Sequence, residues 1–312
     1  MDFDLLGDIG ATASRLALAR DGRILPASRA RLDSRSFAGI IPLVETYLAQ
    51  QGRPQLDRMC LAVAGPVNGT TSHLTNLGWD IDAIRFDHLA PGGVRLVNDV
   101  QALARALPHL PGDTRHLLRA GQPEPGAMMV AALGTGFNAA VVHPVAGGGW
   151  LAPGAEAGQI PLPLPPGFDP APLHAAAGTA EVPTLDAILS GRGLVALDAL
   201  HGPARTAPEI TAAMAQGEAR ACRTLGIVSP LLARSLGLLA LVHLPRGGIF
   251  VAGSVGRALM PLVPARDFGR EMAAWGPLGV RLGDIPLHLV TDDGAALHGC
   301  AAFLADQGDL QP

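Results

Sequence analysis

The segment Asp8-Ile9-Gly10-Ala11-Thr12 combines a carboxylate with a glycine turn, which is a pattern suited to phosphate and metal chemistry. Glycine allows the backbone to approach a ligand closely, so the N–H groups of the turn can meet phosphate oxygens. The neighbouring Asp8 can then hold Mg²⁺ through water. A hairpin turn with a purely structural Asp8 is the alternative, and the pattern alone leaves both open.

Asn98-Asp99 stands between the apolar run 95–97 and the helix-prone stretch 100–106. Asn and Asp are favoured residues at helix N-termini, which gives a structural explanation of the pair. The same position keeps a carboxylate ionised and aims it past the strand ends, where α/β sheets bind their ligands. The residues by themselves do not decide between a helix cap and a catalytic acid-base group.

Gly134-Thr135-Gly136 is a second candidate phosphate turn. Glu156 and Gln159 follow in a glycine-containing loop, where a carboxylate and an amide are suited to hydrogen-bonding sugar hydroxyls. A solvated glycine loop with no ligand is the alternative reading of that segment.

The elements that would position these residues alternate between short apolar runs and helical patterns. Two hairpins are expected, at 3–20 and 128–143, each with a glycine- and threonine-containing tip, so we expect a duplicated architecture in which each domain supplies one hairpin. Further strands are expected at 58–67, 95–97, 248–252 and 287–290; helices at 184–199, 207–221, 225–244 and 294–304; and a proline-rich loop at 161–172.

Composition narrows the class of protein. A chain of 312 residues with 48% hydrophobic residues favours two α/β domains over one. A net charge of -4 and 16% charged residues give no electrostatic footprint for nucleic acid or an anionic membrane. This charge balance favours a small-molecule substrate over nucleic acid or a membrane surface.

Location and metal content follow from a few local features. The acidic start Met1-Asp2-Phe3-Asp4 has no secretory signal pattern, so we expect a cytoplasmic protein. The most apolar stretch, 225–244, contains Pro230, Arg234 and His243, which predicts a buried core helix and no membrane span. Three scattered cysteines fit a reducing compartment and provide no zinc site.

Taken in order, the motifs resemble the bacterial glucokinase family of the actin/hexokinase superfamily over 3–304. The cysteine zinc cluster of the related repressor/kinase group is absent, which indicates the non-repressor branch. The matching segments are LLGDIGATASRLAL, LAVAGPV, LTNLGWDID, LVNDVQALA, ALGTGF, GAEAGQ, LSGRGL, SLGLLAL and GGIFVAGS.

The resemblance implies an α/β fold of two RNase H-like (actin/hexokinase-type) domains with an interdomain cleft. The small N-terminal domain would comprise 1–108, completed by the C-terminal helix 294–312, and the large domain 109–293. The implied activity is ATP-dependent phosphorylation of a hexose, chiefly glucose, at the 6-hydroxyl. Implied partners are the hexose, ATP with Mg²⁺, and a second copy in a homodimer, with neither nucleic acid nor membrane.

The resemblance also implies roles for individual residues. Asp99 would be the general base on the 6-hydroxyl, and Asp8 would hold Mg²⁺ through water. The other sugar hydroxyls would be bound by Asn98, Glu156, Gln159 and Asp186. The nucleotide would be bound by Asp8, Gly10, Thr12, Gly134, Thr135, Gly136 and Gly253.

Two sugar-binding positions depart from the family pattern. Gln159 replaces a histidine, and Asp186 replaces a glutamate three residues before Leu-Ser-Gly. The shorter Asp186 withdraws its carboxylate by about 1.5 Å. We therefore expect a roomier pocket at the C1/C2 end of the sugar, or a hexose modified there.

Two other classes of protein remain as alternatives. Ala252-Gly253-Ser254-Val255-Gly256 follows an apolar run, as the nucleophile elbow of a serine hydrolase does, and His288 or His298 would be its base. The elbow lacks the glycine two residues before the serine. A catalytically weak sugar-binding sensor is the other alternative, although the retained Asp8, Asn98, Asp99 and Glu156 argue against it.

Overall fold

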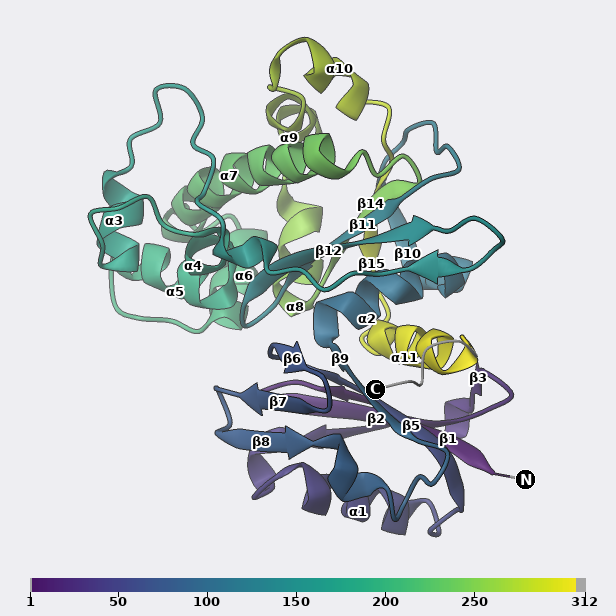
Figure 1. The fold of residues 1–312 in the computed structure, drawn as a ribbon. Helices are drawn as coiled ribbons and strands as arrows, with labels where there is room; N and C mark the ends of the chain where they lie inside the picture. The colour runs from purple at the N-terminus through teal and green to yellow at the C-terminus, as the bar shows by residue number, and fades with distance from the viewer. Residues whose placement is uncertain (1, 307–312) are drawn as a thin grey trace. The chain divides into compact units, whose positions relative to one another are not determined.

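The structure is a computed structural model that describes residues 2–306 (Figure 1). These residues form two compact units, each with a hydrophobic core of its own. The first unit contains residues 2–110, 145–154 and 294–306, and the second contains 111–144 and 155–293. Residues 145–154, expected in the large domain, belong to the first unit in this division. The end of the expected C-terminal segment, 307–312, lies outside the described residues.

The first unit is built on a six-stranded sheet in the order β3-β2-β1-β5-β9, with β4 beside β2. A separate three-stranded sheet has the order β6-β7-β8. The elements are β1 (Phe3–Ile9), β2 (Ala13–Arg20), β3 (Arg23–Ile24), β4 (Ala30–Asp33), α1 (Ile40–Gln50), β5 (Leu56–Val63), β6 (Val67–Asn68), β7 (Thr71–Leu74), β8 (Trp79–Asp82), β9 (Val94–Asn98), α2 (Asp99–Ala106), β13 (Trp150–Leu151) and α11 (Ala295–Ala305).

The second unit is built on a sheet whose strands follow the order β10-β15-β14-β11-β12. Its elements are β10 (Arg115–Arg119), β11 (Met128–Leu133), β12 (Phe137–Pro144), α3 (Ala171–Ala177), α4 (Leu185–Leu189), α5 (Gly191–Ala199), α6 (Ala207–Ala215), α7 (Ala219–His243), β14 (Gly248–Ala252), α8 (Ser254–Leu259), α9 (Ala265–Met272), α10 (Gly279–Leu282) and β15 (Leu287–Val290).

Both sheets share one arrangement of four strands. In the first unit β1 pairs antiparallel with β2 and parallel with β5, and β5 pairs parallel with β9. In the second unit β11 pairs antiparallel with β12 and parallel with β14, and β14 pairs parallel with β15. The duplicated architecture predicted from the two hairpins is therefore confirmed.

The sheet of the first unit is covered on both faces (Figure 1). Helix α1 packs on one face, where Leu43, Val44 and Tyr47 join the buried core of the strands. Helices α2 and α11 lie side by side on the other face and contact each other and β5. The C-terminal helix thus completes the core of the first unit.

Helix α7 is long and apolar enough, by length and composition, to cross a membrane. Over half of its most apolar stretch is nevertheless buried, and it contacts α4, α5, α6, α9 and α10 within the second unit. The core helix expected at 225–244 is therefore confirmed.

Two helices expected as continuous are interrupted. The pattern at 184–199 divides into α4 and α5 at Ser190, which has extended backbone angles and caps α5 by accepting from the Gly193 amide at 3.2 Å. The pattern at 207–221 divides at Gly217, where φ is 73°, a value favoured by glycine. Glu218 then caps α7. The strand expected at 58–67 also ends earlier, at Val63, before Gly65 and Pro66.

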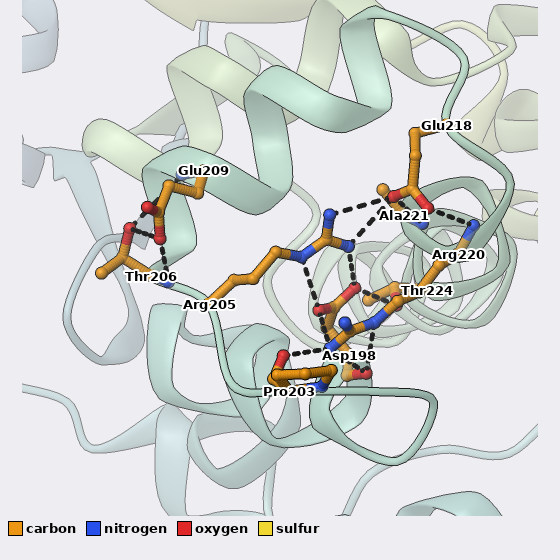
Figure 2. A network of polar contacts seen from close by, with 9 residues as sticks. All are labelled: Asp198, Pro203, Arg205, Thr206, Glu209, Glu218, Arg220, Ala221 and Thr224. Atoms are coloured by element: carbon orange, nitrogen blue, oxygen red, sulfur yellow. Dashed lines mark hydrogen bonds and ion pairs between the residues drawn. The ribbon is translucent and has the colours of Figure 1, made fainter.

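A buried ion-pair network ties α5 to the segments around α6 and α7 (Figure 2). The Asp198 side chain is fully buried and lies 2.8 Å from Arg205 Nη2 and 2.6 Å from Arg220 Nη2. Arg205 Nη1 also donates to Glu218 Oε2 at 3.0 Å. A buried carboxylate requires such partners because burial removes it from water. The network therefore ties α5 to the start of α7 and to the segment that leads into α6.

Candidate functional site

The predicted residues of the first unit gather where three parallel strands end. The register places Ile9 of β1 beside Val63 of β5, and Val63 beside Asn98 of β9. Asp8 and Asp99 therefore lie at the same edge of the sheet, separated by β5. Adjacent strands are about 4.8 Å apart, so their backbones lie about 10 Å from each other.

Asn98 is the N-cap of α2, as its residue type predicts. Its Oδ1 accepts from the amides of Val100 at 3.0 Å and Gln101 at 3.2 Å, and its Nδ2 donates to the Gly65 carbonyl at 3.2 Å. Gln101 completes a capping box by accepting from the Asn98 amide at 3.4 Å. Most of the hydrogen-bonding capacity of Asn98 thus serves the fold.

Asp99 is the first residue of α2 and is partly buried. Its Oδ1 accepts from the Val100 amide at 2.8 Å, which fixes the carboxylate at the positive end of the helix dipole. The backbone at the start of α2 therefore sets the orientation of the Asp99 carboxylate.

The first candidate phosphate turn, Gly10 to Thr12, is held by buried Ser34. Ser34 Oγ donates to the Gly10 carbonyl at 2.7 Å, and its amide donates to the Thr12 carbonyl at 3.2 Å. In the described chain, no hydrogen bond occupies the amides of Ala11 and Thr12. Asp8, just before the turn, lies 3.3 Å from Arg15 Nη1 on the neighbouring strand.

The second candidate phosphate turn, Gly134 to Gly136, forms the tip of the β11–β12 hairpin. The Gly191 amide donates to the Gly134 carbonyl at 2.8 Å, so the start of α5 supports the turn. Gly253 follows β14 with φ at 89° and packs directly on the Leu133 carbonyl, where a side chain would collide. Only glycine fits there, and it lies at the same sheet edge as the turn.

Asn138, the second residue of β12, ties the Glu156 loop to the hairpin. Its Nδ2 donates to the Ala155 carbonyl at 2.8 Å and lies 3.5 Å from Glu156 Oε2. Its Oδ1 accepts from the Gly158 amide at 3.2 Å. Glu156 and Gln159 therefore lie close to the second phosphate turn.

Asp186 lies in α4 against the same turn, with both carboxylate oxygens engaged. Oδ1 accepts from the Phe137 amide at 2.7 Å, and Oδ2 accepts from Arg192 Nη2 at 2.8 Å. The structure thus places Glu156, Gln159 and Asp186 near residues 134–138.

Sequence reasoning overlooked three residues that support these groups: Ser34, Asn138 and Arg192. Ser34 lies 24 residues after Gly10 with no motif around it, so nothing in the sequence marks it. The resemblance implies glycine at the position of Asn138, and Arg192 is the fourth residue of the segment Leu-Ser-Gly-Arg-Gly-Leu. A polar residue at a glycine position was the available signal for Asn138.

Each of the two sheet edges, considered separately, carries groups of the kind that phosphoryl transfer uses. Phosphoryl transfer depends on positioning and on neutralising charge more than on covalent catalysis. Among the described residues, no group of three His, Cys, Asp or Glu side chains forms a metal site. Mg²⁺ commonly uses only one or two carboxylates together with substrate phosphates, so a single Asp8 beside the phosphate turn fits that ion.

Two α/β units with the same hairpin-and-parallel-strand core, each with a glycine turn at its hairpin tip, form an actin/hexokinase-type fold. A solved structure of a glucokinase from an Antarctic psychrotroph has a TM-score of 0.81 and 28% sequence identity, covering 98% of this chain and 99% of that one. A ROK family glucokinase from Streptomyces griseus, solved with glucose and AMPPNP, has a TM-score of 0.66 at 19% identity, covering 98% and 100%, which supports the fold alone.

More specifically, the chain belongs to the glucokinase family. A model of the Glucokinase family matches residues 5–307. A glucokinase of Chromobacterium violaceum is 33% identical over 97% of this chain and 89% of that relative. The predicted family and fold class are therefore confirmed.

The serine hydrolase alternative is not supported. Ser254 begins α8, while the His288 ring stacks on Phe250 with centroids 4.8 Å apart. Burial lowers the pKa of His288. The family match spans this whole region, so Gly253-Ser254 belongs to a glucokinase strand end.

Proposed function

We propose that the protein transfers the γ-phosphoryl group of ATP to the 6-hydroxyl of glucose. The observation that carries this proposal is the match to the glucokinase family over residues 5–307, with Asp99 retained at the start of α2. ATP is the expected donor because two glycine turns with unoccupied amides suit a polyphosphate.

Asp99 acts as the general base in this proposal. Its carboxylate accepts the proton of the 6-hydroxyl as the sugar oxygen bonds to the γ-phosphorus and the bond from that phosphorus to the β-phosphate oxygen breaks. The Val100 amide, 2.8 Å from Oδ1, orients the carboxylate during the transfer. Glucose 6-phosphate and ADP are the products.

Asp8 is the residue that would hold Mg²⁺ through water. When bound, the ion neutralises charge on the phosphates of the nucleotide. Arg15, 3.3 Å from Asp8, fixes the carboxylate. The amides of Ala11, Thr12, Thr135 and Gly136 bind phosphate oxygens. Gly253 gives the nucleotide close access to the strand end.

Glu156, Gln159, Asn98 and Asp186 are assigned to the remaining sugar hydroxyls. Asp186 has both oxygens engaged by the Phe137 amide and Arg192, so it reaches a sugar less readily than a longer side chain would. That observation favours, as a second candidate, a hexose modified at C1 or C2. We also propose a cytoplasmic homodimer, in keeping with the expectation for the family.

An ADP-release assay with Mg-ATP and a panel of hexoses and amino sugars tests the function. For Asp99→Asn we expect kcat to fall about 10² to 10⁴-fold, the usual cost of removing a general base. The amide keeps the acceptor for Val100, so glucose affinity and thermal stability should be retained. Asp113→Asn, an exposed acid in the second unit, is the control. If the Asp99→Asn enzyme kept the parental kcat, Asp99 would have no role as general base and would act only at the helix terminus.

A further inference from the structure

Asp186 and Arg192 form a bridge between the sugar loop and the second phosphate turn. Helix α4 begins beside the sugar loop, because the Leu185 amide donates to the Ile160 carbonyl at 3.0 Å, immediately after Gln159. One residue later, Asp186 accepts from the Phe137 amide at 2.7 Å, immediately after Gly136. A single helical turn therefore touches both segments.

The phosphate turn is anchored at both ends by the segment 186–192. Asp186 holds the Phe137 amide at one end, and the Gly191 amide holds the Gly134 carbonyl at the other, at 2.8 Å. In the described chain, no hydrogen bond occupies the amides of Thr135 and Gly136 between these anchors. The anchors thus direct one amide into the protein and leave two for a ligand.

Little space separates the turn from the Asp186 carboxylate. A Cβ atom added to Gly136 would lie 2.8 Å from Asp186 Oδ1. A negative charge this close to the turn would repel an incoming phosphate. Arg192 compensates that charge, with Nη2 2.8 Å from Asp186 Oδ2.

We propose that Arg192 is a positioning residue for nucleotide binding, which acts by neutralising Asp186 while Asp186 holds the second phosphate turn. This inference rests on the proposed function for the identity of the nucleotide. It assigns Asp186 to the phosphate side of the reaction as well as to the sugar side, and it gives Arg192 a role through its ion pair with Asp186.

Removing the arginine and removing the carboxylate should affect nucleotide affinity differently. Arg192→Ala leaves the Asp186 charge uncompensated, so the KM for ATP and the Kd for Mg-ADP should rise about fivefold, the upper range for an exposed ion pair. Asp186→Asn keeps an acceptor for the Phe137 amide and removes the negative charge, so nucleotide affinity should not fall. In the double variant Asp186→Asn/Arg192→Ala, the Kd for Mg-ADP should return close to the parental value, which makes the two effects on nucleotide affinity non-additive.

Arg246→Ala is the control, because Arg246 forms a 2.8 Å ion pair with Glu124 in the same unit and its side chain is about as exposed as that of Arg192. Its nucleotide affinity should equal that of the parent. Asp186→Glu, which restores the residue type expected for the family, should lengthen the side chain out of register with the Phe137 amide. It should therefore raise the KM for ATP.

Kinetics, titration calorimetry with Mg-ADP and amide hydrogen exchange over 133–138 form the test. We expect Arg192→Ala to weaken Mg-ADP binding and to speed exchange at Phe137, with the KM for glucose changed less than twofold. Unchanged Mg-ADP affinity in Arg192→Ala, or a rise confined to the KM for glucose, would overturn the proposal. If the parent bound Mg-ADP and the variants showed the expected changes in affinity, but the parent phosphorylated no hexose, the proposed function would be refuted and this inference would stand.

Discussion

Tyr47 should make the first unit sensitive to alkaline pH. It is the only tyrosine of the chain, lies in α1 and has no exposed surface. Its hydroxyl donates to the Ser28 carbonyl at 2.9 Å. Burial, which disfavours the tyrosinate, raises the pKa of Tyr47 from 10.0 to about 12, although hydrogen bonds around Ser28 and Leu18 oppose the shift.

The sign of the effect follows from proton linkage. The folded state keeps the Tyr47 proton up to about pH 12, while the unfolded state releases it near pH 10. The stabilisation is therefore complete below pH 10 and is lost as the pH rises from 10 to 12. A difference of about two pKa units corresponds to a loss of about 2.7 kcal/mol in the free energy of unfolding.

Near-ultraviolet absorbance of tyrosinate measures this directly, because no other tyrosine contributes. The sequence has no lysine, so only thiols and Tyr47 titrate in the same range. We expect a midpoint near pH 12 in the folded protein and near pH 10 in guanidinium. Tyr47→Phe should cost about 1 kcal/mol at neutral pH, for the lost hydrogen bond, and should lose less stability than the parent above pH 10.

Two results would refute this reasoning. One is a midpoint near pH 10 in protein that circular dichroism shows to be folded, because the buried hydroxyl would then not be desolvated. The other is an equal loss of stability above pH 10 in the parent and in Tyr47→Phe, which would place the alkaline sensitivity on other groups such as the buried Cys300.

Two further predictions address stability and metal use. Asp198→Asn leaves Arg205 and Arg220 without their buried carboxylate, so it should lower the free energy of unfolding by about 3 to 5 kcal/mol in chemical denaturation; stability equal to the parent would mean that water replaces the ion pair. Asp8→Ala should raise the Mg²⁺ concentration for half-maximal activity and lower kcat, with glucose affinity nearly unchanged, and a loss of glucose binding at normal Mg²⁺ dependence would contradict the assignment.

Strands and hairpins were predictable from the sequence because each is specified by its own residues. The runs at 3–9 and 128–133 are apolar, end at glycine and are followed by a second extended run, and both became hairpins with the expected tips. The prediction of one continuous helix over 184–199 was wrong because a single residue, Ser190, interrupts the helix. Ser190 competes for the backbone amide of Gly193, so one periodic stretch contains the end of α4 and the start of α5.

The motif positions were also predictable, but the partners of their side chains were not. A motif fixes where Asn98 and Asp99 stand along the chain, and the N-cap geometry follows from the residue types. The Asn98 contact with the Gly65 carbonyl joins residues 33 positions apart, and only the parallel pairing of β5 with β9 brings them together. Contacts of this kind depend on the sheet and leave no mark in the local sequence.

Asp186 illustrates how a conservative difference changes a contact as well as its length. From the sequence, Asp in place of Glu is a carboxylate withdrawn by one bond, which predicts a looser hold on the sugar. In the structure the shorter side chain is bonded to the Phe137 amide, while Arg192, six residues on, pairs with its second oxygen. The Asp186 carboxylate is therefore linked to the phosphate turn, and changes at this position should affect nucleotide binding as well as sugar selection.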